Sequence, residues 1–284
     1  MRRQISEILK AGSIPDPYRE AGLLLSYVLG VEKAKLVTAY NVSLSGEQAA
    51  RLISFAHRRA AGEPYAYIVR KCGFMSLEFE VTPDVLIPRP DTEVLVEDVL
   101  ERLRSKREPS SCLILDIGTG SGAIAVSLAK YDQDARIYGI DISAAALKVA
   151  RRNAKRHGVD ERAEFGLCDI MQGFPDFGVQ FDIVVSNPPY VRRGDLMKLE
   201  RGVREYEPYT ALDGGLDGLD FYRRIAACST VAPGGLLALE VGYDQAEAVG
   251  DIIAKTGKYE NINYKKDLSG IIRVVSAQAL PCLL

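Results

Sequence analysis

This sequence has few residues of the kinds that bind metals or form disulfides. Its 284 residues include only two histidines, His57 and His157, and five cysteines with no Cys-x-x-Cys spacing. Two distant histidines do not indicate a metal cluster, and an odd number of scattered cysteines indicates neither a disulfide framework nor a zinc site. The cysteines are Cys72, Cys112, Cys168, Cys228 and Cys282. We therefore expect reduced thiols, no bound metal and a cytoplasmic location.

Long hydrophobic runs and dense basic clusters are also missing from the sequence. No stretch approaches the ~20 consecutive apolar residues of a transmembrane helix, and residues 1–6 lead into an amphipathic pattern that is not typical of a signal peptide. The net charge is −2, with +5 on residues 1–75 and −7 on the remainder, whereas a duplex-DNA binder needs a denser Lys/Arg surface. We expect a monomer with no membrane or direct nucleic-acid partner. The basic N-terminal part fits an acidic partner or an ordinary solvated helical surface.

The remaining composition is that of an ordinary globular protein. Hydrophobic residues make up 47% and charged residues 26% of the chain, which is long enough for one large or two modest domains. Residues 1–72 predict short helices: an apolar stripe of helical spacing covers residues 21–29 and ends at Gly30, and Ser45 with Gln48 predicts a capping box. We expect a small helical bundle that acts as a docking module or a structural cap.

The hydrophobic pattern changes its period after the helices. Residues 73–81 alternate apolar and polar side chains, which predicts a β-hairpin, and residues 86–93 contain two prolines that stiffen the chain. We expect residues 73–90 to link the helical domain to a catalytic domain of residues 91–284. The catalytic domain is predicted to begin with a helix over residues 93–103.

A glycine turn follows the first buried strand of that domain. Residues 112–117 predict the strand, Gly118-Thr119-Gly120-Ser121-Gly122 forms the turn, and residues 123–130 predict a helix. Glycines allow the backbone to approach a ligand, and N–H groups at a helix start can meet polar ligand atoms. The spacing is neither the GxGxxG of dinucleotide folds nor that of a P-loop. Asp116, just before the turn, would repel a pyrophosphate and suits a cationic ligand.

Two further strands end at acidic residues. The strand over residues 136–141 ends at Asp141, about 20 positions after the glycines, which is the usual place for a carboxylate that binds two ribose hydroxyls. The strand over residues 163–167 ends near Asp169, which is placed to accept a hydrogen bond from an adenine amino group. Because carboxyl ends of parallel strands share one edge of a sheet, we expect Asp116, Asp141 and Asp169 to face one crevice.

A fourth strand leads into a proline-rich motif. Residues 181–185 predict the strand, which is followed by Asn187-Pro188-Pro189-Tyr190. Prolines lack N–H groups and have a fixed φ, so we expect the carbonyl oxygens of Asn187 and Pro188 to stay unpaired. With the Asn187 side-chain oxygen and the Tyr190 ring, they form a predicted receptor for a planar NH2 group. An ordinary strand-ending turn is the alternative, which Asn-Pro alone would favour but the full motif does not.

A long polar segment and three further strands follow Tyr190. The polar segment 192–210 is too long for a simple connection, and such segments beside a site are often lids. Strands predicted over residues 236–241, 261–265 and 271–276 complete the sheet.

Residues 112–190 resemble the S-adenosyl-methionine-dependent methyltransferases of the seven-stranded, Rossmann-like class. The resemblance rests on the glycine turn, the three acidic residues and Asn-Pro-Pro-Tyr, a motif shared by enzymes that methylate planar exocyclic or side-chain nitrogens. The whole chain resembles the PrmC/HemK family. Besides the helical N-terminal part, the matching segments are Leu86 to Glu93, Glu207-Pro208, Ala211-Leu212, Gly214 to Leu219, Glu240, Gly242 and Lys266 to Gly270. Asp91, where the family usually has Glu, and Ile271-Ile272 depart from its pattern.

This resemblance implies the fold and the reaction. The expected architecture is an α/β seven-stranded methyltransferase sheet with a small N-terminal helical bundle for substrate recognition and a connecting β-hairpin. The expected activity is that of a protein-glutamine N5-methyltransferase with S-adenosyl-methionine as cofactor. Its substrate would be the glutamine of the Gly-Gly-Gln motif in bacterial class I peptide chain release factors.

The family pattern also implies the site residues. It gives a cofactor-binding set that consists of Asp116, Gly118, Thr119, Gly120, Gly122, Asp141, Ile142, Asp169 and Asn187. The catalytic residues are Asn187, Pro188 and Tyr190, with the Asn187 side-chain oxygen and the Pro188 carbonyl accepting both amide N–H groups. The substrate-binding set adds Pro189, Phe74, Arg89 and Glu93, and the last two serve equally well as residues that only pin the linker.

Two other functions remain open at this stage. An adenine amino group also fits Asn-Pro-Pro-Tyr, so a DNA or RNA adenine-N6 methyltransferase is the main alternative, although the low net charge counts against it. A sensor or scaffold that binds the cofactor without transferring its methyl group is the other. The intact Asn187 motif counts against that alternative.

Overall fold

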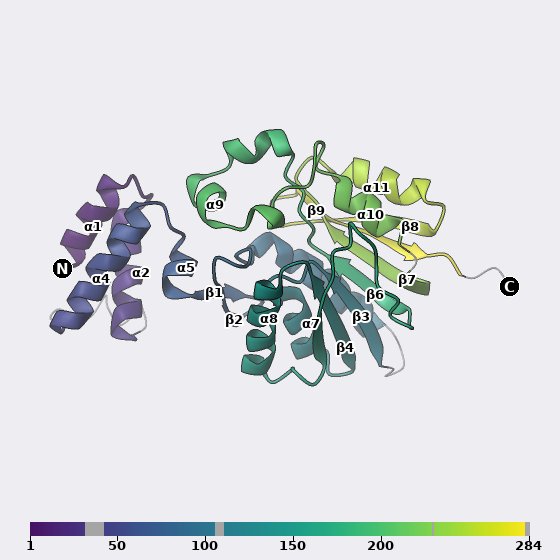
Figure 1. Cartoon of the computed structure of the whole chain (residues 1–284), viewed down its shortest axis with the longest axis horizontal. Coiled ribbons are helices and arrows are strands. Elements are labelled where there is room, and N and C mark those ends of the chain that lie inside the picture. Colours follow the sequence, from purple (N-terminus) through teal and green to yellow (C-terminus); the bar gives the residue numbers. More distant parts are fainter. Residues whose placement is uncertain (32–42, 106–110, 229, 282–284) are drawn as a thin grey trace. The chain divides into compact units, whose positions relative to one another are not determined.

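The computed structural model describes residues 1–31, 43–105, 111–228 and 230–281. These residues form two compact units, which Figure 1 draws with the chain coloured along the sequence. The smaller unit comprises Met1–Arg70 and Glu200–Tyr206, and the larger unit comprises Lys71–Leu199 and Glu207–Leu284. The hairpin region thus belongs to the larger unit, and a short segment from the second half of the sequence belongs to the smaller one.

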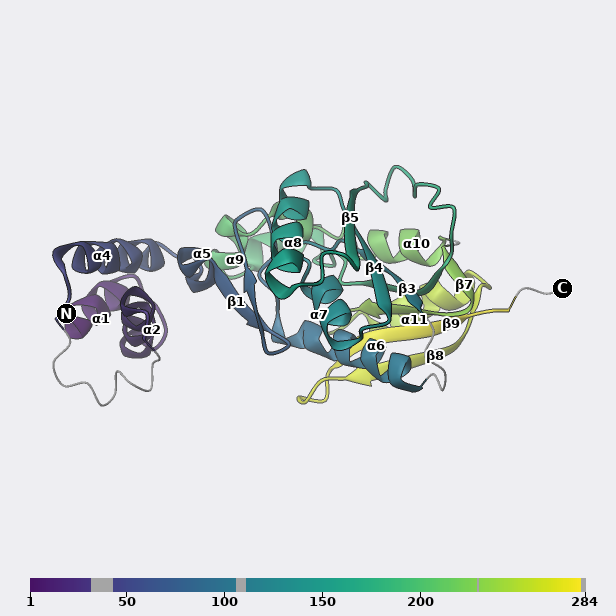
Figure 2. The ribbon, with the colours of Figure 1, turned by 90° about the horizontal axis from the view of Figure 1, so that it is seen from below.

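The smaller unit is helical. Its elements are α1 (Arg2–Ala11), α2 (Pro17–Leu29), α4 (Gly46–Ala60), α5 (Tyr65–Val69) and α9 (Arg201–Tyr206). Leu9, Leu24 and Leu52 are buried where α1, α2 and α4 pack side by side (Figure 2). The predicted capping box is present, because Ser45 Oγ accepts a hydrogen bond from Gln48 N at 3.1 Å and Gln48 Oε1 accepts one from Ser45 N at 3.0 Å.

The larger unit is built on a seven-stranded sheet with the strand order β5-β4-β3-β6-β7-β9-β8. The first five strands in this order are parallel, and β9 runs antiparallel to both of its neighbours. The strands are β3 (Cys112–Ile117), β4 (Ala135–Asp141), β5 (Ala163–Leu167), β6 (Phe181–Ser186), β7 (Val231–Glu240), β8 (Tyr259–Lys266) and β9 (Ile272–Ala279). The predicted seven-stranded α/β fold is confirmed.

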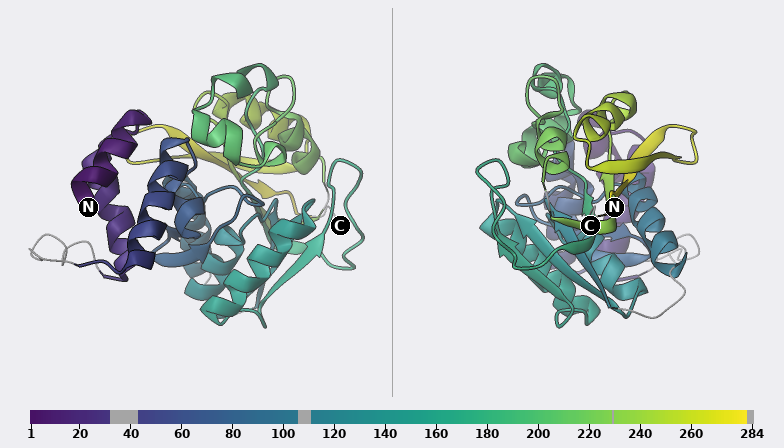
Figure 3. Two further views of the ribbon diagram at one scale, coloured as in Figure 1. Left: turned by 60° about the vertical axis from the view of Figure 1, so that its left-hand side comes forward. Right: turned by 90° about the vertical axis from the view of Figure 1, so that its right-hand side faces the viewer.

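Helices cover both faces of this sheet (Figure 3). Side chains alternate between the faces of a strand, so Ile114 of β3 packs with α6 (Glu93–Ser105), α7 (Ala123–Tyr131) and α8 (Ala144–His157). Its neighbour Leu115 packs in the second core with α10 (Asp220–Ala226) and α11 (Ala246–Lys255). Apolar residues on both sides explain why β3 reads as a continuous hydrophobic run.

The predicted hairpin consists of β1 (Lys71–Phe74) and β2 (Leu77–Glu80), which pair antiparallel. Its two turn residues, Met75 and Ser76, have φ values of 49° and 56°. Positive φ at both central positions is the geometry of a type I′ turn, which Asn-Gly adopts more easily than Met-Ser. Glu93 braces the turn, because its carboxylate accepts a hydrogen bond from Met75 N at 2.6 Å.

Two segments differ in detail from their predictions. The strand β7 begins at Val231, before Pro233-Gly234-Gly235, and its register with β6 shifts between Phe181 and Ile183. The polar segment 192–210 contains the 3-10 helix η2 (Arg193–Lys198), the helix α9 and the first residues of η3 (Tyr209–Ala211). It is therefore ordered by short helices, and its motion as a lid stays a prediction.

The structure describes four of the five cysteines. Cys72, Cys112, Cys168 and Cys228 are free thiols, and Cys282 lies outside the described residues. Among the helices that the structure describes, none is both long enough and apolar enough to cross a membrane.

Candidate active site

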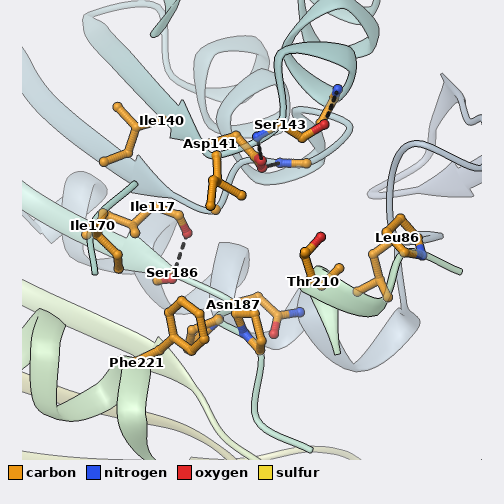
Figure 4. Close-up of a pocket in the computed structure, with 18 of the residues that line it drawn as sticks. Leu86, Ile117, Ile140, Asp141, Ser143, Ile170, Ser186, Asn187, Thr210 and Phe221 are labelled. Carbon is orange, nitrogen blue, oxygen red and sulfur yellow. Dashed lines mark hydrogen bonds between the residues drawn. The ribbon is translucent and has the colours of Figure 1, made fainter. Parts of the chain in front are cut away.

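A pocket of about 320 Å3 lies at the carboxyl ends of β3, β4 and β6 (Figure 4). The strand order reverses between the neighbours β3 and β6, and such a reversal is where open α/β sheets bind ligands. The volume falls within the ~300–1,000 Å3 of small-molecule sites. All residues that line the pocket belong to the larger unit.

The glycine turn after β3 forms one wall of the pocket. Gly118 and Gly120 line it with φ values of 72° and 54°, which L side chains rarely adopt. A Cβ atom on Gly118 would lie 4.0 Å from the main-chain oxygen of Asn187. The N–H groups of Gly118 and Thr119 both donate to the carbonyl of Ile140, at 2.8 and 3.0 Å. The turn is thereby fixed to the end of β4 and leaves open backbone for a ligand.

Asp141 lines the pocket at the end of β4, as predicted from its position in the sequence. Its Oδ2 accepts a hydrogen bond from Gly120 N and its Oδ1 accepts one from Ser143 N, both at 2.8 Å. Burial raises the pKa of Asp141, and these backbone donors act against that rise. Each carboxylate oxygen keeps lone-pair capacity for a further donor such as a ligand hydroxyl.

Ile142 and Asp169 also line the pocket. The Ile142 side chain is 54% exposed, which is unusual for isoleucine and provides an apolar surface beside Asp141. Asp169 Oδ1 accepts a hydrogen bond from Met171 N at 3.0 Å, and Oδ2 accepts one from Gln172 Nε2 at 2.8 Å. Asp169 is thus held in a local turn at the pocket wall.

Asp116 does not face the crevice as expected. It is 0% exposed and does not line the pocket, whereas its strand neighbour Ile117 does, because successive side chains of a strand point to opposite faces. Its Oδ2 accepts a hydrogen bond from Thr119 Oγ1 at 2.6 Å, and Oδ1 has no partner of normal geometry among the described residues. Burial raises the pKa of Asp116 to about 7. Thr119 and Gly122 likewise support the turn from outside the pocket.

The Asn-Pro-Pro-Tyr motif forms the opposite wall. Asn187, Pro188 and Pro189 line the pocket directly after β6. Ser186 Oγ donates to the main-chain oxygen of Ile117 at 2.7 Å, so the ends of β6 and β3 are tied together. Among the described residues, no hydrogen bond to the main-chain oxygen of Asn187 or Pro188 is found. These oxygens are available as acceptors.

Tyr190, predicted to pack against the substrate, does not line the pocket and is half-buried. Burial raises its pKa to about 12, and the nearby Glu240 adds to the rise. The backbone at Gly214 packs directly against the motif. A Cβ atom on Gly214 would lie 2.7 Å from the Cα of Tyr190 and 2.8 Å from the Pro189 oxygen. Glycine at position 214 therefore allows the motif to pack against the following loop.

Three residues predicted to bind substrate have other contacts in this structure. Phe74 is 1% exposed inside the core of the larger unit and does not line the pocket, which argues against its assignment to substrate packing. Arg89 forms an ion pair with the buried Glu207, and Glu93 accepts from Met75 N. Neither Arg89 nor Glu93 lines the pocket, and their contacts agree with the alternative that they pin the segment between hairpin and sheet.

Several lining residues were not assigned to the site from the sequence. They come from segment 84–86, from residues 208–211 and from Phe221 of α10. Figure 4 labels Leu86, Thr210 and Phe221 among the side chains around Asn187. The Glu207-Pro208 and Ala211-Leu212 motifs pointed to the second segment, but nothing local in the sequence pointed to Phe221. Long-range packing brings these walls together.

A second buried carboxylate lies next to the motif. Glu240, at the end of β7, is 2% exposed, and burial raises its pKa to about 7. The neighbouring Thr92 and Asn187 side chains act against that rise, and Asn187 Nδ2 donates to Thr92 Oγ1 at 3.1 Å. The sequence marked Glu240 only as part of a family pattern. The structure brings it to the candidate site.

Among the residues that the structure describes, no group of three or more His, Cys, Asp or Glu side chains is placed to hold a metal ion. The site consists of carboxylates, an amide, free carbonyl oxygens and apolar walls.

Comparisons with known proteins agree with this geometry. Residues 109–266 match a family described as a methyltransferase domain, and residues 1–69 match the PrmC N-terminal domain. The chain is 41% identical over 260 residues to a release factor glutamine methyltransferase of Clostridium acetobutylicum, covering 91% of this chain and 90% of the relative. It is 45% identical over 265 residues to that of Moorella thermoacetica, covering 92% and 91%.

A solved methyltransferase from Pyrococcus furiosus shares the fold, with a TM-score of 0.51 at 18% identity over 84% of this chain and all of the other. Full-length similarity at over 40% identity goes further than a shared fold. The chain therefore belongs to the family of release factor glutamine methyltransferases.

Proposed function

We propose that this S-adenosyl-methionine-dependent methyltransferase modifies the side-chain amide nitrogen, N5, of the glutamine in the Gly-Gly-Gln motif of bacterial class I peptide chain release factors. The observation that carries the proposal is the placement of Asn187 and Pro188. Their acceptors lie on one wall of a pocket whose other wall is the glycine turn with Asp141. Two relatives that match over 91% and 92% of this chain are named release factor glutamine methyltransferases.

The residues around the glycine turn fit the cofactor. Gly118 and Gly120 leave room beside the backbone for its methionine part, Asp141 would accept from the ribose hydroxyls, and Asp169 with the exposed face of Ile142 would hold the adenine. When bound, S-adenosyl-methionine supplies an electrophilic methyl group on a positively charged sulfur. The carboxylates of this pocket favour a ligand of that charge.

The substrate side of the pocket orients a weak nucleophile. An amide nitrogen reacts poorly because its lone pair is delocalised into the carbonyl group. In our proposal Asn187 Oδ1 and the Pro188 carbonyl each accept one N–H of the glutamine amide, which holds the nitrogen in place and stabilises the positive charge that develops on it. Pro189 would pack against the flat amide from the pocket wall.

The remaining parts of the chain suit a protein substrate. We propose that the helical unit, which matches the PrmC N-terminal domain, contacts the release factor. Because release factors act on ribosomes, we place the enzyme in the cytoplasm, and we propose a monomer that needs no direct nucleic-acid contact. Sedimentation of the enzyme with and without a release factor tests the monomer and the complex.

Methyl transfer from labelled S-adenosyl-methionine is the direct test of this function. The substrates are a purified release factor, its variant with Gly-Gly-Ala in place of Gly-Gly-Gln, and adenine-containing DNA. We expect label on the wild-type factor alone. Label on the DNA would support an adenine methyltransferase, and label on none of the three, with the cofactor still bound, would support a binding protein.

A further inference from the structure

We propose that Glu240 is a positioning residue that acts with Thr92 to hold the Asn187 amide in one orientation, with its oxygen toward the substrate nitrogen. The inference rests on the proposed function and goes beyond it, because it assigns a role to a carboxylate that does not line the pocket. Glu240 touches neither substrate nor cofactor in this account. It acts only through Asn187.

The register of the sheet places the two residues together. In the parallel pair β6 and β7, Ser186 lies opposite Leu239. Asn187 and Glu240 are the next residues of their chains, so they leave adjacent strands at the same edge. Thr92 reaches them from the 3-10 helix η1 (Pro90–Thr92) and is 4% exposed. Three elements of the larger unit thus meet behind one side chain of the pocket.

Hydrogen bonding determines which end of the Asn187 side-chain amide faces the protein interior. A primary amide has a donating NH2 end and an accepting oxygen, and the two ends have nearly the same shape. Asn187 Nδ2 donates to Thr92 Oγ1 at 3.1 Å, and the Thr92 and Asn187 side chains lie near enough to the Glu240 carboxylate to lower its pKa. An ionised carboxylate can only accept, so it requires the NH2 end to face inward. The Asn187 oxygen is then left for the pocket.

The chain retains Glu240 at an energetic cost. The side chain is 2% exposed, and its Oε2 has no hydrogen-bond partner of normal geometry among the described residues. A buried carboxylate with an unpaired oxygen destabilises the folded state relative to an apolar or amide side chain of similar size. Tyr222, itself fully buried, donates from its hydroxyl to the main-chain oxygen of Glu240 at 2.9 Å and fixes the backbone there. A directional role explains why an anion is placed at this position.

The charges around Glu240 determine when it is ionised. Asp91 from η1 raises its pKa, Arg273 from β9 lowers it, and the hydroxyls of Tyr190 and Tyr222 lie close by. Burial has the largest effect and brings the pKa to about 7. Above that pH the carboxylate only accepts. Below it, the protonated acid can donate, so Asn187 is no longer held in one orientation and methyl transfer slows.

The test compares hydroxyl and carboxylate variants that preserve shape. Glu240→Gln removes the obligatory acceptor, Thr92→Val removes the hydroxyl and keeps the branched side chain, and Thr92→Ser keeps the hydroxyl and loses a methyl group. Ser127→Ala is the matched control, because it removes a buried, unpaired hydroxyl of α7 away from the site. Binding of S-adenosyl-homocysteine shows whether each variant keeps a folded pocket.

We expect Glu240→Gln and Thr92→Val to lower kcat for release-factor methylation about 10- to 100-fold. Thr92→Ser should recover most of the loss, and Ser127→Ala should match the wild type. S-adenosyl-homocysteine affinity should stay constant throughout. The wild-type kcat should rise through a pKa near 7, and Glu240→Gln should lose that rise. A mere packing role would make Thr92→Ser worse than Thr92→Val and leave the pH profile unchanged.

A readout that needs no substrate separates this inference from the proposed function. Asn187 is one of five asparagines in the sequence, so selective 15N labelling gives few side-chain NH2 signals, and Asn187→Ala identifies the relevant pair. These signals should shift through the pKa of Glu240 in the wild type but not in Glu240→Gln. If the shift is seen and no release factor is methylated, the proposed function fails and the orientation mechanism stands. If it is missing, or the variants keep full kcat, the inference is overturned.

Discussion

The two buried carboxylates of the larger unit look alike but differ in what they contact. Asp116 and Glu240 each lie in a central parallel strand, each is at most 2% exposed, and each has one oxygen without a normal partner. Burial raises the pKa of both to about 7. By burial and charge alone, they would be assigned the same role.

Their partners separate them. Asp116 accepts from Thr119, three residues ahead in the same turn, so its influence stays within the backbone that shapes the cofactor side of the pocket. Glu240 lies beside Thr92 and Asn187, which come from distant parts of the chain and lower its pKa, and Asn187 lines the pocket. A buried charge with only local partners supports a turn, whereas one that contacts a pocket residue can control its chemistry.

The largest effect should follow from Asn187→Ala. Removing the side chain takes away the acceptor that Glu240 orients, so kcat for methyl transfer should fall by about 1,000-fold. Affinity for S-adenosyl-homocysteine, measured by calorimetry, should change little, because the Asp116 turn and Asp141 are untouched. Equal losses of turnover and affinity would show that Asn187 belongs to the cofactor side instead.

The next largest effect should come from Asp141→Ala, on the other wall of the pocket. The change removes the carboxylate that accepts from Gly120 N and Ser143 N and, in our proposal, from the ribose. The dissociation constant for S-adenosyl-homocysteine should rise about 10- to 100-fold. At saturating S-adenosyl-methionine, most of kcat should return. If it does not, Asp141 contributes to methyl transfer itself, and the division between a cofactor-binding wall and a transfer wall is wrong.

The sequence predicted the sheet well because its signals are local. Short apolar runs predicted the buried strands. Gly118 and Gly120 indicated a turn with positive φ, and the Asn-Pro pair at Asn187 indicated the end of a strand. Such features depend on a few neighbouring residues, so they survive in the linear pattern. Asp141 was placed correctly for the same reason, since the end of β4 is visible in the sequence.

The errors arose where side-chain direction or distant contacts decide the outcome. Asp116 was expected in the crevice, but its place inside β3 points its carboxylate into the protein. Phe74 was expected on the substrate, but the hairpin buries it against Phe79. The arrangement of Thr92, Asn187 and Glu240 depends on the register of β6 with β7, which no local pattern encodes.

The pH dependence of stability should be similar for the two carboxylates, even though their effects on activity differ. Each folded-state pKa, about 7, lies above the usual value of 3.8 for Asp or 4.5 for Glu, so the folded protein holds the proton more tightly. Wild-type stability should therefore fall as pH rises from about 4 through 7, by on the order of 3 kcal/mol per group. We measure the free energy of unfolding by urea titration at pH 5 and pH 8. Asp116→Asn and Glu240→Gln should each reduce the difference between these two values by the contribution of one carboxylate.

Activity assays on the same two variants complete that test. Only Glu240→Gln should slow methyl transfer at saturating cofactor. A matching loss of kcat in Asp116→Asn would mean that a buried charge near the pocket is enough and that the contact with Asn187 is irrelevant. A flat stability profile in the wild type would show that neither group changes its protonation on folding in this range.

The smallest effect should come from Thr119→Val, the counterpart of Thr92→Val. The hydroxyl of Thr119 donates to Asp116 and opposes the rise of its pKa, so its removal should destabilise the ionised folded state by about 1–2 kcal/mol. The loss should be present at pH 8, where Asp116 is charged, and should fade below pH 6, where the acid is protonated. Because Thr119 contacts no pocket acceptor, kcat at saturating cofactor should hold. Thr119 and Thr92 each lie beside a buried carboxylate, Asp116 and Glu240. On this result, only the loss of the Thr92 hydroxyl would slow methyl transfer, because only Thr92 contacts Asn187 of the pocket.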